Sequence, residues 1–174
     1  QEQAAIIHGL LNSPDRFNLF RGVAGSGKTS TLQELCRGLQ SCGLERIYLI
    51  APTNSAVEVL KGEGFQYSST VASFLLSEKK PEAGSYGIID ESGLNSLREG
   101  AEIIRLANEN DYRVLFVGDA RQHTSVESGD FFRLLENHSG IARFELRTIR
   151  RQQSENYRAG IAYCADGYFQ AAFD

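Results

Sequence analysis

The chain contains no methionine and no tryptophan, and it has only three prolines, three cysteines and three histidines in 174 residues. No apolar run approaches the roughly 20 residues of a membrane-spanning helix, so the sequence predicts no membrane segment. The chain also has no start of the signal-peptide kind, in which basic residues are followed by an apolar stretch and a small-residue cleavage site. Because an intact reading frame begins with methionine, the start at Gln1 indicates a segment of a longer protein.

The few cysteines and the net charge exclude two further classes of protein. Cys36, Cys42 and Cys164 form no C-x-x-C pair and lie near no histidine at metal-ligand spacing, so we expect reduced thiols in a cytoplasmic protein. The net charge of −4 argues against binding nucleic acid by bulk positive charge. A groove that holds a single strand through backbone hydrogen bonds and a few cations remains compatible with this charge.

The apolar pattern predicts an α/β fold. A hydrophobic content of 41% suits one globular domain with a core, and apolar runs at 17–21, 47–51, 86–90, 114–118 and 142–146 predict strands. Helical patterns cover 3–11, 28–40, 55–61, 95–109, 129–137 and 154–172, and a polar loop covers 77–85. Alternating strands and helices predict a mostly parallel sheet with helices on both faces.

Three of the predicted helices have an apolar face that we expect to be buried. The expected buried residues are Leu32, Leu35, Cys36 and Leu39, then Leu97, Ala101, Ile104 and Leu106, and finally Phe131, Phe132, Leu134 and Leu135.

Residues 22–29 match the phosphate-binding pattern G-x-x-x-x-G-K-[ST] in full. Glycines let backbone N–H groups point at phosphate oxygens, and the following helix directs the positive end of its dipole at the same anion. Lys28 would reach the β- and γ-phosphates, and the Thr29 hydroxyl would bind Mg²⁺. The apolar strand before the loop disfavours an incidental glycine-rich turn. The expected nucleotide contacts are Gly22, Val23, Ala24, Gly25, Ser26, Gly27, Lys28, Thr29 and Ser30.

Polar residues follow two other apolar strands. Ligands bind at the carboxyl ends of parallel strands, so Asp90 would hold Mg²⁺ and Glu91 would polarise an attacking water. Taken alone, the two acids could equally cap a helix. After the next strand, Gln122 could bond the γ-phosphate and the water while Asp119 fixes the loop, although this segment alone could be any turn.

In this order, the motifs resemble those of superfamily 1 DNA helicases of the 5′-to-3′ branch, which includes the alpha subunit of exonuclease V. They are more similar still to the helicase part of conjugative relaxases. The matching segments are residues 2–5 (Q motif), 22–29 (motif I), 51–54 (motif Ia), 70–75 (a DNA-facing motif), 90–92 (motif II), 118–129 (motif III) and 146–152 (motif IV). The resemblance implies a RecA-like P-loop fold, in which residues 1–174 form the first motor domain and 147–174 begin the connection to a second one.

The resemblance also implies roles for individual residues. Gln3 would bond the adenine edge and favour ATP; alternatively it is a surface residue of the first helix. Arg151 would stabilise charge on the γ-phosphate, with Arg150 or a plain salt bridge as the alternatives. Single-stranded DNA would contact Pro52, Thr53, Asn54, Thr70 and His123, although Thr53 or Asn54 could simply cap the helix at 55–61.

The function implied is that of an ATP-dependent DNA helicase with ATP and Mg²⁺ as cofactors. Its expected partners are single-stranded DNA, a second motor domain of the same chain and the conjugation machinery. The alternatives are an exonuclease V-type repair helicase, a degenerate copy that binds DNA or protein, and a small-molecule kinase, which would not explain residues 118–122. We expect residues 1–174 alone not to unwind duplex DNA, since no second motor domain or nickase domain lies within them.

Overall fold

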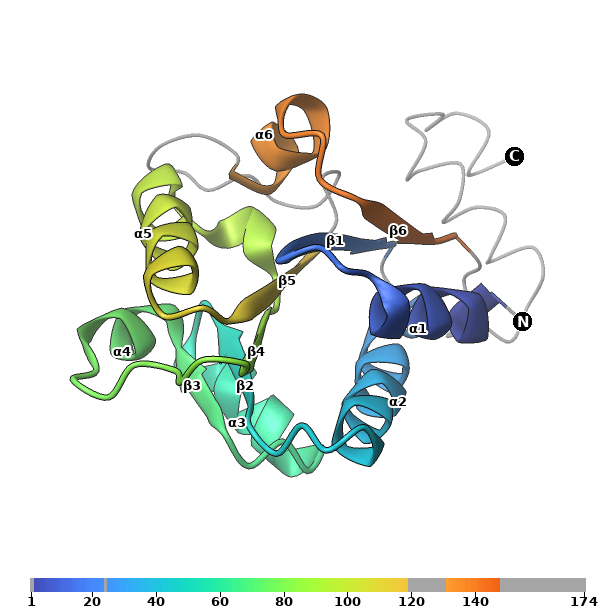
Figure 1. Ribbon diagram of the computed structural model, residues 1–174, viewed down its shortest axis with the longest axis horizontal. Coiled ribbons are helices and arrows are strands. Elements are labelled where there is room, and N and C mark those ends of the chain that lie inside the picture. The colour runs from blue at the N-terminus through green and yellow to red at the C-terminus, as the bar shows by residue number, and fades with distance from the viewer. Residues whose placement is uncertain (1, 24, 119–130, 148–174) are drawn as a thin grey trace, which may run out of the picture.

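Six parallel strands form the sheet of the computed structural model, which describes residues 2–23, 25–118 and 131–147 (Figure 1). The strand order is β3-β2-β4-β5-β1-β6. The strands are β1 (Phe17–Gly22), β2 (Ile47–Ala51), β3 (Ser68–Thr70), β4 (Tyr86–Ile89), β5 (Arg113–Gly118) and β6 (Arg143–Leu146). The helices are α1 (Glu2–Asn12), α2 (Lys28–Ser41), α3 (Asn54–Gly62), α4 (Val71–Leu76), η1 (Ser92–Leu94, a 3₁₀ turn), α5 (Leu97–Glu109) and α6 (Phe131–His138).

Helices cover both faces of this sheet, as the continuous apolar strands predicted. Neighbouring residues of β1 show the division, because Phe20 packs with α1, α2 and α3 whereas Leu19 packs with α4, α5 and α6 (Figure 1). Successive side chains of a strand point to opposite faces, so strands buried on both faces need apolar residues at every position. The predicted α/β fold with a parallel sheet is confirmed.

Two short elements were missed by the sequence analysis. Strand β3 pairs with β2 at the edge of the sheet, with Ser68 opposite Leu49, and helix α4 follows directly after Thr70. Three half-buried polar residues carry no apolar period, so only pairing with β2 makes this segment a strand. The five predicted strands are all present, each within one residue of its predicted start and end.

The buried face of α5 differs from the predicted one. Leu97 and Ala101 are exposed, whereas the buried residues are Gly100, Ile103, Leu106 and Ala107. A Cβ built on Gly100 would lie 2.3 Å from the ring of Phe131, so this glycine gives α6 room to pack against α5. The helix begins at Leu97 because Ser96 and Glu99 form a capping box.

The other two predicted faces are closer to the structure. All four predicted residues of α2 are buried, and of the four predicted residues of α6 Leu134 alone is exposed, at 48%. Cys36 is buried and Cys42 exposed, both as free thiols, and Cys164 lies outside the described residues. Within the described ranges, no helix is both long and apolar enough to cross a membrane.

Helix α1 is wedged between α2 and β6 through two glycine contacts. A Cβ on Gly9 would lie 2.4 Å from the ring of Phe144 in β6, and a Cβ on Gly38 would lie 2.9 Å from Leu11. Larger residues at these two positions would separate the elements. The close contacts therefore hold the last turns of α1 against β6 and against the last turns of α2.

Candidate nucleotide-binding site

The phosphate loop lies between the carboxyl end of β1 and the first turn of α2. Gly25 and Gly27 have φ angles of 74° and 95°, a left-handed conformation that glycine adopts without steric cost. The N–H of Ser26 donates to the carbonyl of Val23 at 3.1 Å and closes a turn within the loop. The loop geometry thus requires glycine at Gly27, which the motif specifies, and at Gly25, which occupies one of its variable positions.

Lys28 folds over the start of the loop. Its Nζ donates to the carbonyl of Gly22 at 2.5 Å, and a Cβ built on Gly22 would lie 2.8 Å from Cγ of the lysine. The same Cβ would lie 2.8 Å from Oγ of Ser26. Gly22 is therefore glycine because the lysine stem and the serine hydroxyl occupy the space of a side chain.

The hydroxyl of Ser26 is a buried polar group without a hydrogen bond. Its residue is fully buried, and Oγ has no partner in the structure. Burying such a group without a partner costs about 1–3 kcal/mol. Since the hydroxyl lies beside the Lys28 stem, this local arrangement suits an oxyanion that accepts from both groups.

The two acids follow β4 in a turn with an unusual backbone. The N–H of Asp90 donates to the carbonyl of Ile50 at 2.8 Å, which holds this residue beside β2. Oδ1 of Asp90 then accepts from the N–H of Glu91 at 2.9 Å. Glu91 is exposed and has a φ of 48°, and a non-glycine residue in this left-handed region costs about 1–2 kcal/mol. The turn is closed by the buried hydroxyl of Ser92, which donates to the carbonyl of Ile89 at 2.7 Å.

Asp90 and the phosphate loop lie at the same edge of the sheet, because β4, β5 and β1 are parallel and each site follows the carboxyl end of its strand. Burial is the main reason why the pKa of Asp90 is raised, and the charge of Glu91 raises it further. The hydrogen bond from the N–H of Glu91 and the charge of Lys28 both lower it. β5 separates β4 from β1, so Asp90 and Gly22 follow strands on either side of the same central strand. A carboxylate and the hydroxyl of Thr29 are hard oxygen donors of the kind that Mg²⁺ takes.

Gln3 contacts the phosphate loop from α1. Its Nε2 donates to the carbonyl of Gly27 at 3.2 Å and to Oγ1 of Thr31 at 3.0 Å. The residue is half-buried, so the interpretation of Gln3 as a plain surface residue is wrong. Both amide hydrogens are engaged, which leaves Oε1 as the polar atom available to a ligand. Thr31, a buried residue that the motif does not include, was missed by the sequence analysis.

Two of the predicted DNA contacts are helix caps. Oγ1 of Thr53 accepts from the N–H of Ala56 at 3.2 Å, and Oγ1 of Thr70 accepts from the N–H of Ser73 at 3.1 Å. The capping alternative therefore holds for Thr53, and contact with DNA stays a prediction for both residues. They follow β2 and β3, so they lie at the same edge of the sheet as the phosphate loop.

The remaining predicted residues are placed as follows. Val23 and Thr29 are half-buried in the loop, Ser30 and Asn54 are exposed, and Pro52 is half-buried after β2. Ala24, Asp119, Gln122, His123, Arg150 and Arg151 lie outside the described residues. In the described ranges, no three His, Cys, Asp or Glu side chains gather as a metal site.

A groove of about 600 Å³ lies on the α4–α5 side of the sheet. Its lining residues are Ala72, Leu75, Leu76, Leu94, Ser96, Arg98, Glu99 and Glu102. The sequence analysis did not predict it, since its lining comes from the missed helix α4 and from α5.

Comparisons with known proteins agree with this architecture. The model of a family described as AAA domain matches residues 1–174. The probable conjugal transfer protein TraA of Sinorhizobium fredii (strain NBRC 101917 / NGR234) is 28% identical over 159 residues, which cover 89% of this chain and 14% of that protein. Conjugal transfer protein TraA of Rhizobium radiobacter is 29% identical over 176 residues, which cover 99% of this chain and 16% of that protein. The multifunctional conjugation protein TraI of Escherichia coli (strain K12) is 27% identical over 164 residues, covering 88% and 9%.

Among solved structures, the crystal structure of Pif1 helicase from Candida albicans matches with a TM-score of 0.66. The two chains are 19% identical, and the match covers 92% of this chain and 44% of that one. At this identity the likeness shows the fold alone. The P-loop fold and the resemblance to conjugative helicases are both confirmed, and the chain spans between 9% and 16% of the length of these curated relatives.

Proposed function

Because this chain belongs to the AAA domain family, we propose that it is the nucleotide-binding first motor domain of an ATP-dependent DNA helicase. We infer further that the parent protein is a conjugative relaxase that acts on single-stranded DNA, since the relatives are named as conjugal transfer proteins. The observation that supports the proposal most is that the phosphate loop, with Lys28 and the buried Ser26 hydroxyl, and Asp90 follow parallel strands at one edge of the sheet.

The residues of the loop bind and orient the triphosphate. Lys28 exchanges its bond to the Gly22 carbonyl for bonds to the β- and γ-phosphates, in which both partners are charged. The Ser26 hydroxyl gains the partner that the folded loop does not provide. Mg²⁺, held by Thr29 and Asp90, supplies charge neutralisation at the phosphates when bound. Glu91, exposed beside Asp90, orients the attacking water, and Gln122 contacts the γ-phosphate and that water.

Gln3 provides a preference for adenine. Since both hydrogens of its amide are engaged by the loop and Thr31, its Oε1 is an acceptor that suits the amino group of adenine. The corresponding position of guanine carries a carbonyl oxygen, which would face Oε1 without a hydrogen between them. We therefore expect the domain to prefer ATP over GTP.

The DNA-binding face consists of Pro52, Thr53, Asn54, Thr70 and His123, and it holds the strand through hydroxyl, amide and backbone groups. Residues 147–174 begin the connection to a second motor domain of the same chain. Arg151 stabilises charge on the γ-phosphate. Loss of that phosphate releases Gln122 and Arg151 and lets the two domains open. The protein works in the cytoplasm together with the conjugation machinery.

The test is the ATPase activity of the full-length protein with and without single-stranded DNA. We expect DNA to stimulate hydrolysis in the wild type, and Lys28→Ala or Glu91→Gln to abolish it. Lys61→Ala is the matched control, because this exposed lysine only pairs with Glu58 at 3.3 Å.

Other outcomes separate the alternatives. If the protein binds nucleotide but single-stranded DNA does not stimulate ATP hydrolysis, a degenerate copy that binds DNA or protein is favoured. If a small phosphate acceptor stimulates ATP hydrolysis instead, a kinase is favoured. Residues 1–174 alone should bind nucleotide weakly and unwind no duplex, as a strand-displacement assay would show; robust unwinding by this segment would contradict the two-domain mechanism.

A further inference from the structure

The hydroxyl of Thr31 completes a small cluster of hydrogen bonds between α1 and the phosphate loop. Its Oγ1 donates to the carbonyl of Gly27 at 2.9 Å and accepts from Nε2 of Gln3 at 3.0 Å. The same Nε2 donates to the Gly27 carbonyl at 3.2 Å. The carbonyl, the hydroxyl and the amide nitrogen therefore bond one another in a closed set, and Thr31 is only 1% exposed.

The chemistry of these three groups fixes which way the Gln3 amide is turned. A carbonyl oxygen can only accept, so the hydrogen of the Thr31 hydroxyl is committed to Gly27. The hydroxyl can then only accept from Gln3, which must present an N–H group to it. Turning the amide over would place its oxygen beside two acceptors with no hydrogen between them. Gln3 therefore directs its NH2 group at the loop and its Oε1 away from both partners.

The packing around the cluster leaves the amide in this place. A Cβ built on Gly27 would lie 2.9 Å from Nε2 of Gln3, so the loop has room for the amide because this residue has no side chain. Helix α1, which carries Gln3, and helix α2, which carries Thr31, share one hydrophobic core through buried residues such as Ile6 and Leu35. The two partners of the cluster are therefore held at a defined separation.

We propose that Thr31 is a positioning residue that sets the orientation of the Gln3 amide and thereby the preference for adenine over guanine. The inference rests on the proposed function, in which Oε1 of Gln3 accepts from the amino group of adenine. Because Thr31 is buried, it acts through Gln3 and not through a contact with the base. Without its hydroxyl, one of the two acceptors that hold the NH2 group is lost. The amide then turns over more often, and the carbonyl oxygen of guanine meets an N–H group.

The activity test compares Thr31→Val with Thr31→Ser in the full-length protein. Valine keeps the branched shape and removes one hydrogen bond to the amide, so the ratio of kcat/KM for ATP to that for GTP should fall about fivefold. Thr31→Ser keeps the hydroxyl, and its ratio should stay within twofold of the wild type. Ser41→Ala is the matched control, because it removes the same kind of bond to the carbonyl four residues earlier, at the other end of α2. An unchanged ratio in Thr31→Val overturns the proposal.

Equilibrium binding provides a measurement that does not depend on hydrolysis. Specificity is a difference between two affinities, and the proposal gives the two nucleotides opposite signs. With non-hydrolysable analogues, Thr31→Val should bind the adenine nucleotide about twofold more weakly and the guanine nucleotide about twofold more tightly than the wild type. Damage to the phosphate loop would instead weaken both, since the triphosphate is common to them. Equal weakening of both analogues therefore overturns the proposal.

A double-mutant cycle tests whether Thr31 acts through Gln3. In the Gln3→Ala background, Thr31→Val should leave the ATP/GTP ratio within twofold, because no amide remains to be oriented. A fall as large as in the wild-type background overturns the proposal. Failure of the proposed function is seen separately, as a wild type whose ATP hydrolysis does not respond to single-stranded DNA. A wild type that uses ATP and GTP equally overturns the role of Thr31 and leaves the helicase proposal standing.

Discussion

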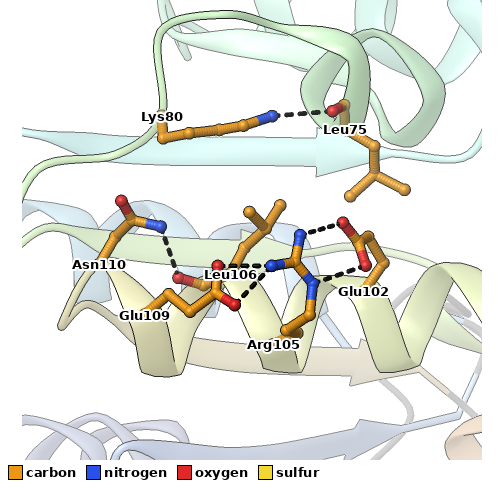
Figure 2. A network of polar contacts seen from close by, with 7 residues as sticks. All are labelled: Leu75, Lys80, Glu102, Arg105, Leu106, Glu109 and Asn110. Carbon is orange, nitrogen blue, oxygen red and sulfur yellow. Dashed lines mark hydrogen bonds and ion pairs between the residues drawn. The ribbon is translucent and has the colours of Figure 1, made fainter.

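At the phosphate loop, the buried hydroxyl of Ser26 has no hydrogen bond, whereas on the outer face of α5 the guanidinium of Arg105 is held by two carboxylates (Figure 2). The loop also has two glycines in the left-handed region, and Glu91 nearby shares that conformation. In α5 the backbone is a regular helix that a capping box begins.

Figure 2 shows polar groups on and beside α5 that bond to other groups of the same chain. Nε of Arg105 donates to Glu102 at 2.9 Å, and its Nη1 pairs with Glu109 one turn further on. Nδ2 of Asn110 donates to the Leu106 carbonyl at 2.9 Å, and Nζ of Lys80 donates to the Leu75 carbonyl at 2.8 Å. The bond to Arg105 lowers the pKa of Glu102. These pairs are exposed to solvent, where such interactions are weak and screened by salt.

The difference separates polar groups that the fold satisfies on α5 from a buried hydroxyl in the loop that has no hydrogen-bond partner among the described residues. The α5 network is closed, since its donors face acceptors of the same chain. We expect the unpartnered hydroxyl of Ser26 to cost stability in the loop, and a bound anion to offset that cost. Substitutions in the loop should therefore raise stability and lower activity, whereas substitutions on α5 should lower stability slightly and leave activity unchanged.

The largest effect is expected for Asp90→Asn. Loss of the carboxylate should lower DNA-stimulated ATP hydrolysis of the full-length protein about 10²–10³-fold, as for other groups that stabilise transition-state charge. Without Mg²⁺ and nucleotide, the same variant should be more stable than the wild type at neutral pH, because folding raises the pKa of the Asp90 carboxyl.

The sign of this pH dependence follows from linkage. A carboxyl whose pKa is raised by folding disfavours the folded state once it ionises, so its cost is present at neutral pH. The stability difference between Asp90→Asn and the wild type should vanish below the ordinary pKa of 3.8, where both forms are neutral. Denaturant titrations at pH 7 and pH 3 measure this difference, with the exposed Asp15→Asn as the control. A variant less stable than the wild type at pH 7 would contradict the role of burial.

A smaller effect is expected for Gln3→Ala. Removing the amide should raise KM for ATP about tenfold and reduce the preference for ATP over GTP, because one hydrogen bond to the base is lost. The measurement is steady-state hydrolysis of both nucleotides. Gln33→Ala is the control, since this half-buried glutamine donates only to the Glu63 carbonyl at 3.4 Å. If the ratio of the hydrolysis rates of ATP and GTP does not change, Gln3 contacts only the phosphate loop and does not bind the base.

Ser26→Ala tests whether the buried hydroxyl of the loop lowers stability and contributes to triphosphate binding. Removing a buried hydroxyl without a partner should raise the free energy of unfolding by about 1 kcal/mol, while triphosphate affinity falls several-fold. Chemical denaturation and nucleotide titration of the same samples test both effects. In the exposed Ser41→Ala, which loses only a bond to the Arg37 carbonyl, neither quantity should change appreciably. Loss of stability in Ser26→Ala would mean that the fold itself satisfies this hydroxyl.

The smallest effect is expected for Arg105→Ala. Its ion pairs are exposed, so Tm should fall by about 2 °C or less, and hydrolysis should not change. The Tm difference should shrink further in high salt, where exposed charges are screened. A Tm loss that persists at high salt would assign the effect to packing of the arginine stem.

Prediction from the sequence succeeded where the determinants are local. The loop at 22–29 is contiguous, and the apolar run before Asp90 places the acid at a strand end, so pattern alone identified both. Prediction failed for the α5 face, because Gly100 is buried by the ring of Phe131 in α6. The periodicity of apolar residues along α5 cannot predict a contact with another helix. Prediction also missed β3, whose three polar residues become a strand only through pairing with β2.

The sequence by itself determined the α/β class, the phosphate loop and the acids at the end of β4, since each depends on residues adjacent in the chain. Only the tertiary structure decided that Gln3 contacts Thr31, that Glu2 reaches Arg147 and that Thr53 and Thr70 lie at the same edge of the sheet as the phosphate loop. The physical reason is that these contacts depend on the strand order β3-β2-β4-β5-β1-β6 and on the close seat of α1, which are set by packing between segments far apart in the chain.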